Sequence, residues 1–124
     1  FKKYLGAGKA GDIKEHWPDI GTVVQWIRQA GGVAVLAHPS KYKMTRTKLT
    51  ELIDDFSNAG GEAMEVVSGL QIPSVTRGLG KLCNTFGLLA SCGSDFHTPD
   101  KKWAALGMIS NIPDTCNPVW DRWA

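Results

Sequence analysis

The sequence lacks most of the features that would assign it at once to a broad class of proteins. No apolar run is long enough to span a bilayer and no stretch has the pattern of a signal peptide, so we expect a cytoplasmic protein with no membrane contact. The formal net charge of +2 is close to balance, which argues against a basic groove for nucleic acid. The three cysteines form an odd set without Cys-x-x-Cys spacing and are expected to be reduced thiols.

An initiator methionine is also missing. The segment 1–5 resembles the tail of a helix already under way, and Gly6, Gly8 and Gly11 follow it in a loose basic connection. We therefore expect a piece of a larger protein. With 43% hydrophobic residues and no internal repeat, the 124 residues suit one domain with a modest core.

Helical and strand patterns alternate along the chain. Helices are predicted from the N-cap Asp19 to the stop at Gly31, from the cap Thr47 to Ala59, and from Pro73 to Phe86. Unalternating apolar runs at 33–37, 63–67 and 87–92 are typical of strands buried on both faces, and 106–110 is predicted as a short fourth strand. The segment 112–124 is expected to lie on the body as an irregular strap, held by Trp120 and Trp123.

This order predicts an α/β fold of parallel strands with flanking helices. Strands that alternate with helices of this length form βα units with right-handed crossovers. Three or four such units would make the closing part of a barrel or an incomplete open sheet, with an unpaired edge.

The motif Gly93-Ser94-Asp95-Phe96-His97 follows one of the predicted strands. Such a strand would carry Asp95 and His97 to its carboxyl end, where α/β folds place their ligands and catalytic groups. Residues two apart in an extended segment point to the same side, so a carboxylate and an imidazole can converge on one metal ion. The alternative is an ordinary turn and cap sequence.

His38 ends the strand predicted at 33–37, because Pro39 cannot donate to a strand ladder. Taken on its own, a rim histidine favours a hydrogen-bonded structural role over metal binding. If both strands share a sheet, however, His38 faces the same rim as Asp95 and His97. Imidazole and carboxylate together suit Zn, Mn or Fe.

Two further features of the sequence each allow two roles. Lys41, Lys43 and Arg46 lie in the loop after His38, where they would hold a substrate phosphate or remain solvated loop charges. Glu65 is a carboxylate in an otherwise apolar strand and needs a partner. A structural hydrogen bond is the favoured role for Glu65, and contact with a metal or a cationic loop residue is the alternative.

The residues Ala30 to Pro39, Glu65-Val66-Val67-Ser68-Gly69 and Gly93-Ser94-Asp95-Phe96-His97 together resemble the later motifs of the PHP (polymerase and histidinol phosphatase) superfamily. The resemblance is closest to bacterial nucleoside 3′,5′-bisphosphate phosphatases that also act as 5′-to-3′ exoribonucleases on short RNA. It runs the whole length of the chain.

The resemblance implies a distorted (β/α)₇ barrel with divalent metal ions at its carboxyl rim, of which residues 1–124 are the C-terminal part. It implies that His38, Asp95 and His97 are metal ligands and that Asp95 and His97 serve catalysis. Lys41 stands where the subgroup commonly has an arginine, and Lys41 and Arg46 are kept from the cationic loop as contacts to the substrate phosphate. Manganese is the first choice for these ions, and Fe, Zn or Mg are the alternatives. The remaining ligands, among them an N-terminal His-x-His, would lie in the absent N-terminal half, and His16 matches none of them.

The implied activity is hydrolysis of a phosphate ester of a nucleotide or short RNA, and we expect the isolated 124 residues to perform it poorly or not at all. Two other functions stay open. One is a non-catalytic PHP-like interaction module that docks through its exposed barrel edge. The other is an RNA-binding segment that uses the chain's lysines and arginines, and steep salt dependence would identify it. Those cations are Lys2, Lys3, Lys9, Lys41, Lys43, Arg46 and Lys48.

Overall fold

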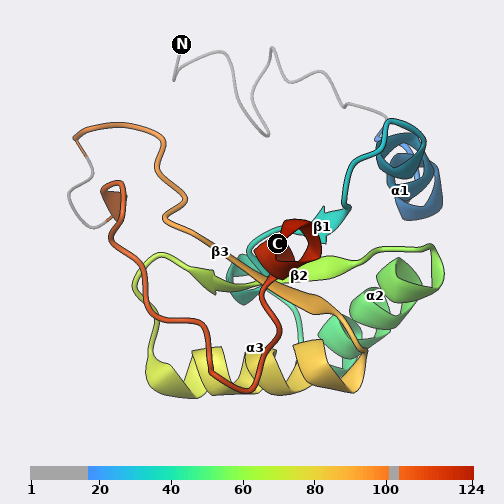
Figure 1. The fold of residues 1–124 in the computed structure, drawn as a ribbon. Coiled ribbons are helices and arrows are strands. Elements are labelled where there is room, and N and C mark those ends of the chain that lie inside the picture. Colours follow the sequence, from blue (N-terminus) through green and yellow to red (C-terminus); the bar gives the residue numbers. More distant parts are fainter. Residues whose placement is uncertain (1–16, 101–103) are drawn as a thin grey trace, which may run out of the picture.

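A computed structural model describes residues 17–100 and 104–124, and shows a three-stranded parallel sheet with helices packed against it (Figure 1). The strands are β1 (Val35–Leu36), β2 (Ala63–Ser68) and β3 (Leu89–Gly93), in the spatial order β1-β2-β3. The predicted α/β class with parallel strands is confirmed. The predicted helix tail at 1–5 and the residues Lys2, Lys3, Lys9 and His16 lie outside the described residues.

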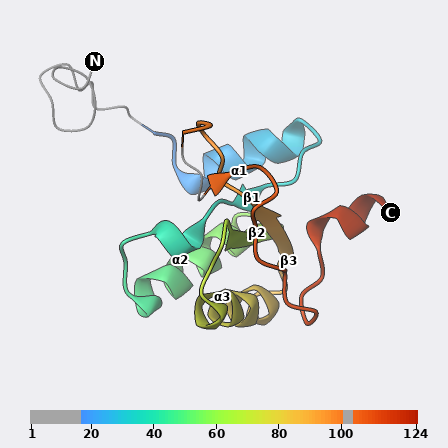
Figure 2. The ribbon, with the colours of Figure 1, turned by 90° about the vertical axis from the view of Figure 1, so that its left-hand side faces the viewer.

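Helices α2 (Arg46–Asn58) and α3 (Pro73–Thr85) connect successive strands and lie on the same face of the sheet (Figures 1 and 2). Because consecutive strands are neighbours and both crossovers cover one face, the arrangement is that of a barrel segment rather than a doubly wound sheet. Helix α1 (Ile20–Gln29) packs beside α2. None of the helices in the described part of the chain is long and apolar enough to cross a membrane.

The helix ends follow local rules, with one correction. Asp19 caps α1 by accepting a hydrogen bond from the Thr22 N–H at 2.9 Å. Gly31 takes a left-handed conformation after α1, at φ 78°. The prediction of Thr47 as the cap of α2 was wrong. Thr45 is the cap and its hydroxyl accepts from the Lys48 N–H, so the helix begins two residues earlier than expected.

The core centres on β2. In this strand every residue except Glu65 is buried, as expected for a strand with neighbours on both sides and a helix on one face. The bulkiest fully buried side chains come from β2, the helices and the turn after β1: Val24, Pro39, Ile53, Met64, Val66, Val67 and Cys83.

The two outer strands are less buried than the sequence suggested. The strand predicted at 33–37 shortens to Val35–Leu36, and Val35 is 38% exposed. The strand predicted at 87–92 runs from Leu89 to Gly93, and only Ala90 in it is buried. An apolar run does not distinguish a central strand from one with an open side, which explains the difference.

The fourth strand predicted at 106–110 does not form. Gly107 takes φ 78° and the Met108 N–H donates to the Ala105 carbonyl, so the chain turns where the prediction had it extended. The segment is held instead by side-chain and backbone hydrogen bonds to the loop after β2. The Ser110 N–H donates to the Gly69 carbonyl, and the Gln71 N–H donates to the Ser110 hydroxyl.

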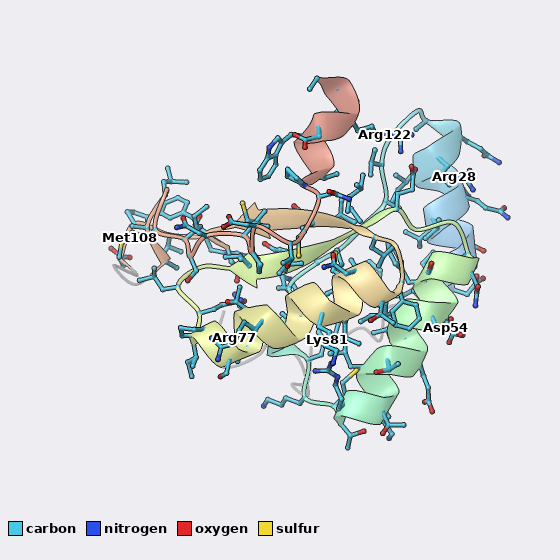
Figure 3. All side chains as sticks on the ribbon, turned by 60° about the horizontal axis from the view of Figure 1, so that its bottom comes forward. Arg28, Asp54, Arg77, Lys81, Met108 and Arg122 are labelled. Atoms are coloured by element: carbon cyan, nitrogen blue, oxygen red, sulfur yellow. The ribbon has the colours of Figure 1, made fainter. Side chains whose placement is uncertain are left out.

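The C-terminal segment does run along the body as a strap, but tryptophans do not hold it. Trp120 and Trp123 are 50% and 68% exposed. The strap is fixed by the Ala90 N–H, which donates to the Asn117 carbonyl at 2.7 Å, and by an ion pair between Arg122 and Glu62. Arg122, which is labelled in Figure 3, belongs to the short 3-10 helix η3 (Val119–Trp123).

Candidate active site

The three strands end at one rim of the sheet, and the sequence-predicted residues follow those ends. His38 comes after β1, Gly69 after β2 and Asp95 after β3. The Gly69 N–H donates to the Gly93 carbonyl at 2.7 Å, which ties the ends of β2 and β3 together. A cavity of about 440 Å³ opens at this rim. Its lining residues are Lys41, Ser68, Gly69, Leu70, Ser94, Asp95, His97 and Ala104.

His38 and Asp95 both have left-handed backbone conformations. Their φ angles are 32° and 54°, and within 17–100 and 104–124 they are the only residues other than glycine with positive φ. Such a conformation costs about 1–3 kcal/mol for an ordinary residue and clusters at functional sites. The backbone is therefore strained at two of the positions that the sequence marked as metal ligands.

Asp95 lies between two basic side chains. The Lys41 ammonium pairs with its Oδ2, and the His97 Nδ1 lies 3.7 Å from its Oδ1. The hydrogen bond from Lys41 is the main cause that lowers the pKa of the Asp95 carboxyl, so Asp95 is an anion at neutral pH.

Asp95 and His97 meet by a different geometry from the one expected. Because Asp95 is left-handed, the segment is not extended and simple alternation does not apply. The His97 Nδ1 instead lies 2.8 Å from the Asp95 backbone carbonyl oxygen, and the side chain is 70% exposed.

His38 is held on its backbone and its ring. Its N–H donates to the Glu65 carboxylate Oε2 at 2.6 Å, which supports the predicted structural role of Glu65. The Tyr42 ring meets the imidazole edge to face at 6.0 Å between centroids, and the Tyr42 hydroxyl donates to the Ala37 carbonyl. The His38 Nδ1 is buried and has no hydrogen-bond partner.

Ser68 is a rim residue that sequence reasoning missed. It ends β2, is 7% exposed and has a buried hydroxyl without a partner. Its backbone N–H is satisfied by the Gln71 side-chain oxygen at 2.9 Å. A serine at the end of an apolar strand carries no distinctive signal, so only the fold reveals that it lines the cavity.

The two predicted phosphate contacts are placed differently. Lys41 lines the cavity at the rim and pairs with Asp95 there. Arg46 begins α2, and a side chain added at Gly78 of α3 would lie 3.4 Å from its Nη1. Arg46 is not among the residues that line the cavity.

The donor types at the rim fit a divalent metal, although the side chains do not converge. Across the described residues no three His, Cys, Asp or Glu side chains form a group that could hold a metal ion. The unpartnered His38 Nδ1 is nevertheless a free buried ligand atom, and Asp95 already accepts a cation. The assignment of His38, Asp95 and His97 as ligands stays a prediction.

Two curated relatives are similar over nearly the whole chain. A 3′,5′-nucleoside bisphosphate phosphatase from Chromobacterium violaceum is 41% identical over 120 residues, which are 97% of this chain and 42% of the relative. A 5′-3′ exoribonuclease from Haemophilus influenzae is 40% identical over 122 residues, 98% of this chain and 44% of the relative. The chain thus spans less than half the length of these relatives. No family model matches the sequence.

Solved structures agree with the sequence similarity. The structure of an amidohydrolase from C. violaceum, with bound sulfate and no metal, has a TM-score of 0.82 at 40% identity and covers 98% of this chain and 42% of that one. A Bifidobacterium adolescentis structure assigned as a metal-dependent phosphoesterase has a TM-score of 0.64 at 26% identity, covering 89% and 38%. The resemblance to the C-terminal part of this phosphatase and exoribonuclease group is confirmed.

Proposed function

We propose that this chain is the C-terminal part of a single PHP domain in a metal-dependent phosphoesterase, which hydrolyses a phosphate monoester or diester of a nucleotide or short RNA. The observation that carries the proposal is the backbone strain at His38 and Asp95, at the rim where parallel strands of an α/β fold end. The names of the two relatives support the substrate class.

The residues divide into metal ligands and phosphate contacts. His38, Asp95 and His97 would hold divalent ions, most readily Mn with Fe, Zn or Mg as alternatives, and such ions supply Lewis-acid chemistry that activates water and polarises a phosphoryl group. Asp95 and His97 are assigned to catalysis through the ions they would hold, and the His97 side chain is exposed at the cavity. A rim histidine that does not bind an ion would protonate the leaving oxygen. Lys41 and Arg46 are assigned to substrate phosphate, with Lys41 the better placed of the two.

The site is incomplete without more chain. A bridged pair of metal ions needs about six to eight protein donors, and the proposal assigns only His38, Asp95 and His97 here. We therefore propose that an N-terminal half of the same domain supplies the others, and that residues 1–124 alone turn over phosphate esters poorly or not at all. The three free thiols suit a location in the cytoplasm.

The test is phosphate release by the protein expressed from its complete reading frame. With Mn²⁺ present, it should release phosphate from a nucleoside 3′,5′-bisphosphate and mononucleotides from a short 5′-phosphorylated RNA. Asp95→Asn and His97→Ala should each lower the rate at least about 100-fold, since even residues that only support a metal ligand cost about 10–100-fold. Asp54→Asn, on the exposed side of α2 in Figure 3, is the matched control and should keep wild-type rates.

Two results would reject the proposal. Wild-type rates in Asp95→Asn and His97→Ala would remove both residues from the site. A complete reading frame without an upstream His-x-His, together with no hydrolysis by the wild type, would favour the non-catalytic interaction module.

A further inference from the structure

Glu65 contacts the ends of both outer strands from the middle of the sheet. On one side its Oε2 accepts the His38 N–H at 2.6 Å, just beyond β1. On the other side its Oε1 lies against Gly93, the last residue of β3. It is the one residue of β2 that is not buried.

The Glu65 carboxylate occupies the space that a side chain at Gly93 would need. A Cβ built on Gly93 would lie 2.9 Å from the Glu65 Oε1, closer than real Cβ contacts. Gly93 does not have a positive φ, so its backbone conformation is open to any residue. A side chain at Gly93 would therefore require the Glu65 carboxylate to move from the position in which it accepts the His38 N–H.

The strand is irregular at the same place. The pairing of β2 with β3 shifts its register between Glu65 and Val67. Such a bulge changes the direction of nearby side chains and often lies beside a functional site.

We propose that Glu65 is a positioning residue that sets His38 and the Gly93-Ser94-Asp95 turn in place together. Its carboxylate holds the backbone of His38 in the left-handed conformation, and its contact with Gly93 fixes where β3 delivers Asp95. That His38 and Asp95 bind metal once they are positioned rests on the function proposed above. The positioning itself does not.

The first readout needs neither metal nor substrate. In the metal-free protein from the complete reading frame, we would measure hydrogen exchange of the His38 amide by NMR. Glu65→Ala should speed this exchange about tenfold or more, because a hydrogen bond to a charged acceptor is lost. Glu65→Gln keeps an oxygen acceptor and should exchange more slowly than Glu65→Ala. Unchanged exchange in Glu65→Ala would overturn the proposal.

The second readout tests the link to β3. Gly93→Ala should also speed His38 exchange, because the new methyl group displaces the carboxylate. In the Glu65→Ala background the same substitution should add little, since the space is then free. Fully additive effects would overturn the proposal. Gly78→Ala in α3, where an added Cβ meets nothing closer than 3.4 Å, is the control and should leave His38 exchange unchanged.

The third readout connects positioning to the site. The Mn²⁺ affinity, measured by calorimetry on folded protein, should fall about 10–100-fold in Glu65→Ala and recover in part in Glu65→Gln. Wild-type affinity in a folded Glu65→Ala would overturn the role in the site. If the wild type binds no Mn²⁺, the proposed function fails, while the exchange cycle still decides the role of Glu65. If Glu65→Ala does not fold, His38 exchange in Gly93→Ala against Gly78→Ala decides it.

Discussion

The helix-covered body and the carboxyl rim of this sheet follow opposite rules. In the body, the side chains of Asp19 and Thr45 cap α1 and α2. Strand β2 is packed with buried apolar residues. At the rim, His38 and Asp95 are left-handed, and the His38 Nδ1 and the Ser68 hydroxyl are buried without partners. The body pairs its polar groups and buries its apolar ones, whereas the rim carries backbone strain and buried polar atoms without a partner in the chain.

This contrast separates residues that hold the fold from residues that the proposed function assigns to the site. Removing a body residue should destabilise the protein whether or not it is active. Removing a rim residue should cost activity and little stability, which is the trade-off expected where function needs strain.

The largest effect is expected in the body. Met64 in β2 is fully buried, so Met64→Ala should lower the free energy of unfolding by about 2–5 kcal/mol through lost burial and a cavity. Urea denaturation measures it. Met44→Ala, at a site 40% exposed, is the control and should cost less than about 0.5 kcal/mol. Equal losses in the two variants would contradict the packing described for β2.

Helix capping should give an intermediate effect. Thr45→Ala removes the acceptor for the Lys48 N–H and should cost about 0.5–2 kcal/mol of unfolding free energy. Thr47→Ala, at the second residue of the same helix, should be close to neutral because Thr47 is not the cap. Thermal unfolding of the two variants side by side checks this, and a larger loss in Thr47→Ala would move the helix start back to the position predicted from sequence.

A smaller change in stability is expected at the rim. In His38→Gly, relief of the left-handed strain offsets the lost Tyr42 contact and the added freedom of the unfolded chain. The free energy of unfolding should stay within about 1 kcal/mol of wild type. Phosphate release by the complete protein should nevertheless fall at least about 100-fold. A loss of stability as large as that of Met64→Ala would erase the distinction between rim and body.

The smallest effect concerns pH. The hydrogen bond from the Thr22 N–H lowers the pKa of the Asp19 carboxyl below its ordinary value of 3.8. Because the folded pKa is the lower one, this stabilisation is complete above the ordinary pKa and is lost as pH falls through the folded pKa. The difference in urea midpoint between wild type and Asp19→Ala should therefore shrink from about pH 5 to about pH 3. A difference that stays constant would exclude the charge on Asp19 as its cause.

Local patterns predicted the body well. Helix existence, the Asp19 cap and the parallel strand order follow from periodicity and glycine stops, which are properties of neighbouring residues. Sequence alone did not show that 106–110 turns at Gly107, because the apolar residues Leu106 and Met108 suit a strand equally well.

The site was predicted in composition but not in geometry. The sequence placed His38, Asp95 and His97 at one rim, and in the structure they follow the ends of β1 and β3 at that rim. It did not show the left-handed backbone at His38 and Asp95, because nothing in the neighbouring sequence marks that conformation, which residues other than glycine rarely adopt. Ser68 was missed for the same reason, since its burial depends on segments far apart in the chain.

The cysteines make residues 1–124 simple to label at a chosen point. Cys83 and Cys116 are buried, and burial raises the pKa of the Cys83 thiol to about 12 and also raises that of Cys92. A maleimide reagent reacts with thiolates, so at neutral pH these thiols should react slowly. An Asp121→Cys substitution on exposed η3 would then take up a dye or a surface tether selectively. Because Arg122 pairs with Glu62 at the amino end of β2, a molecule tethered there would present its rim to solution.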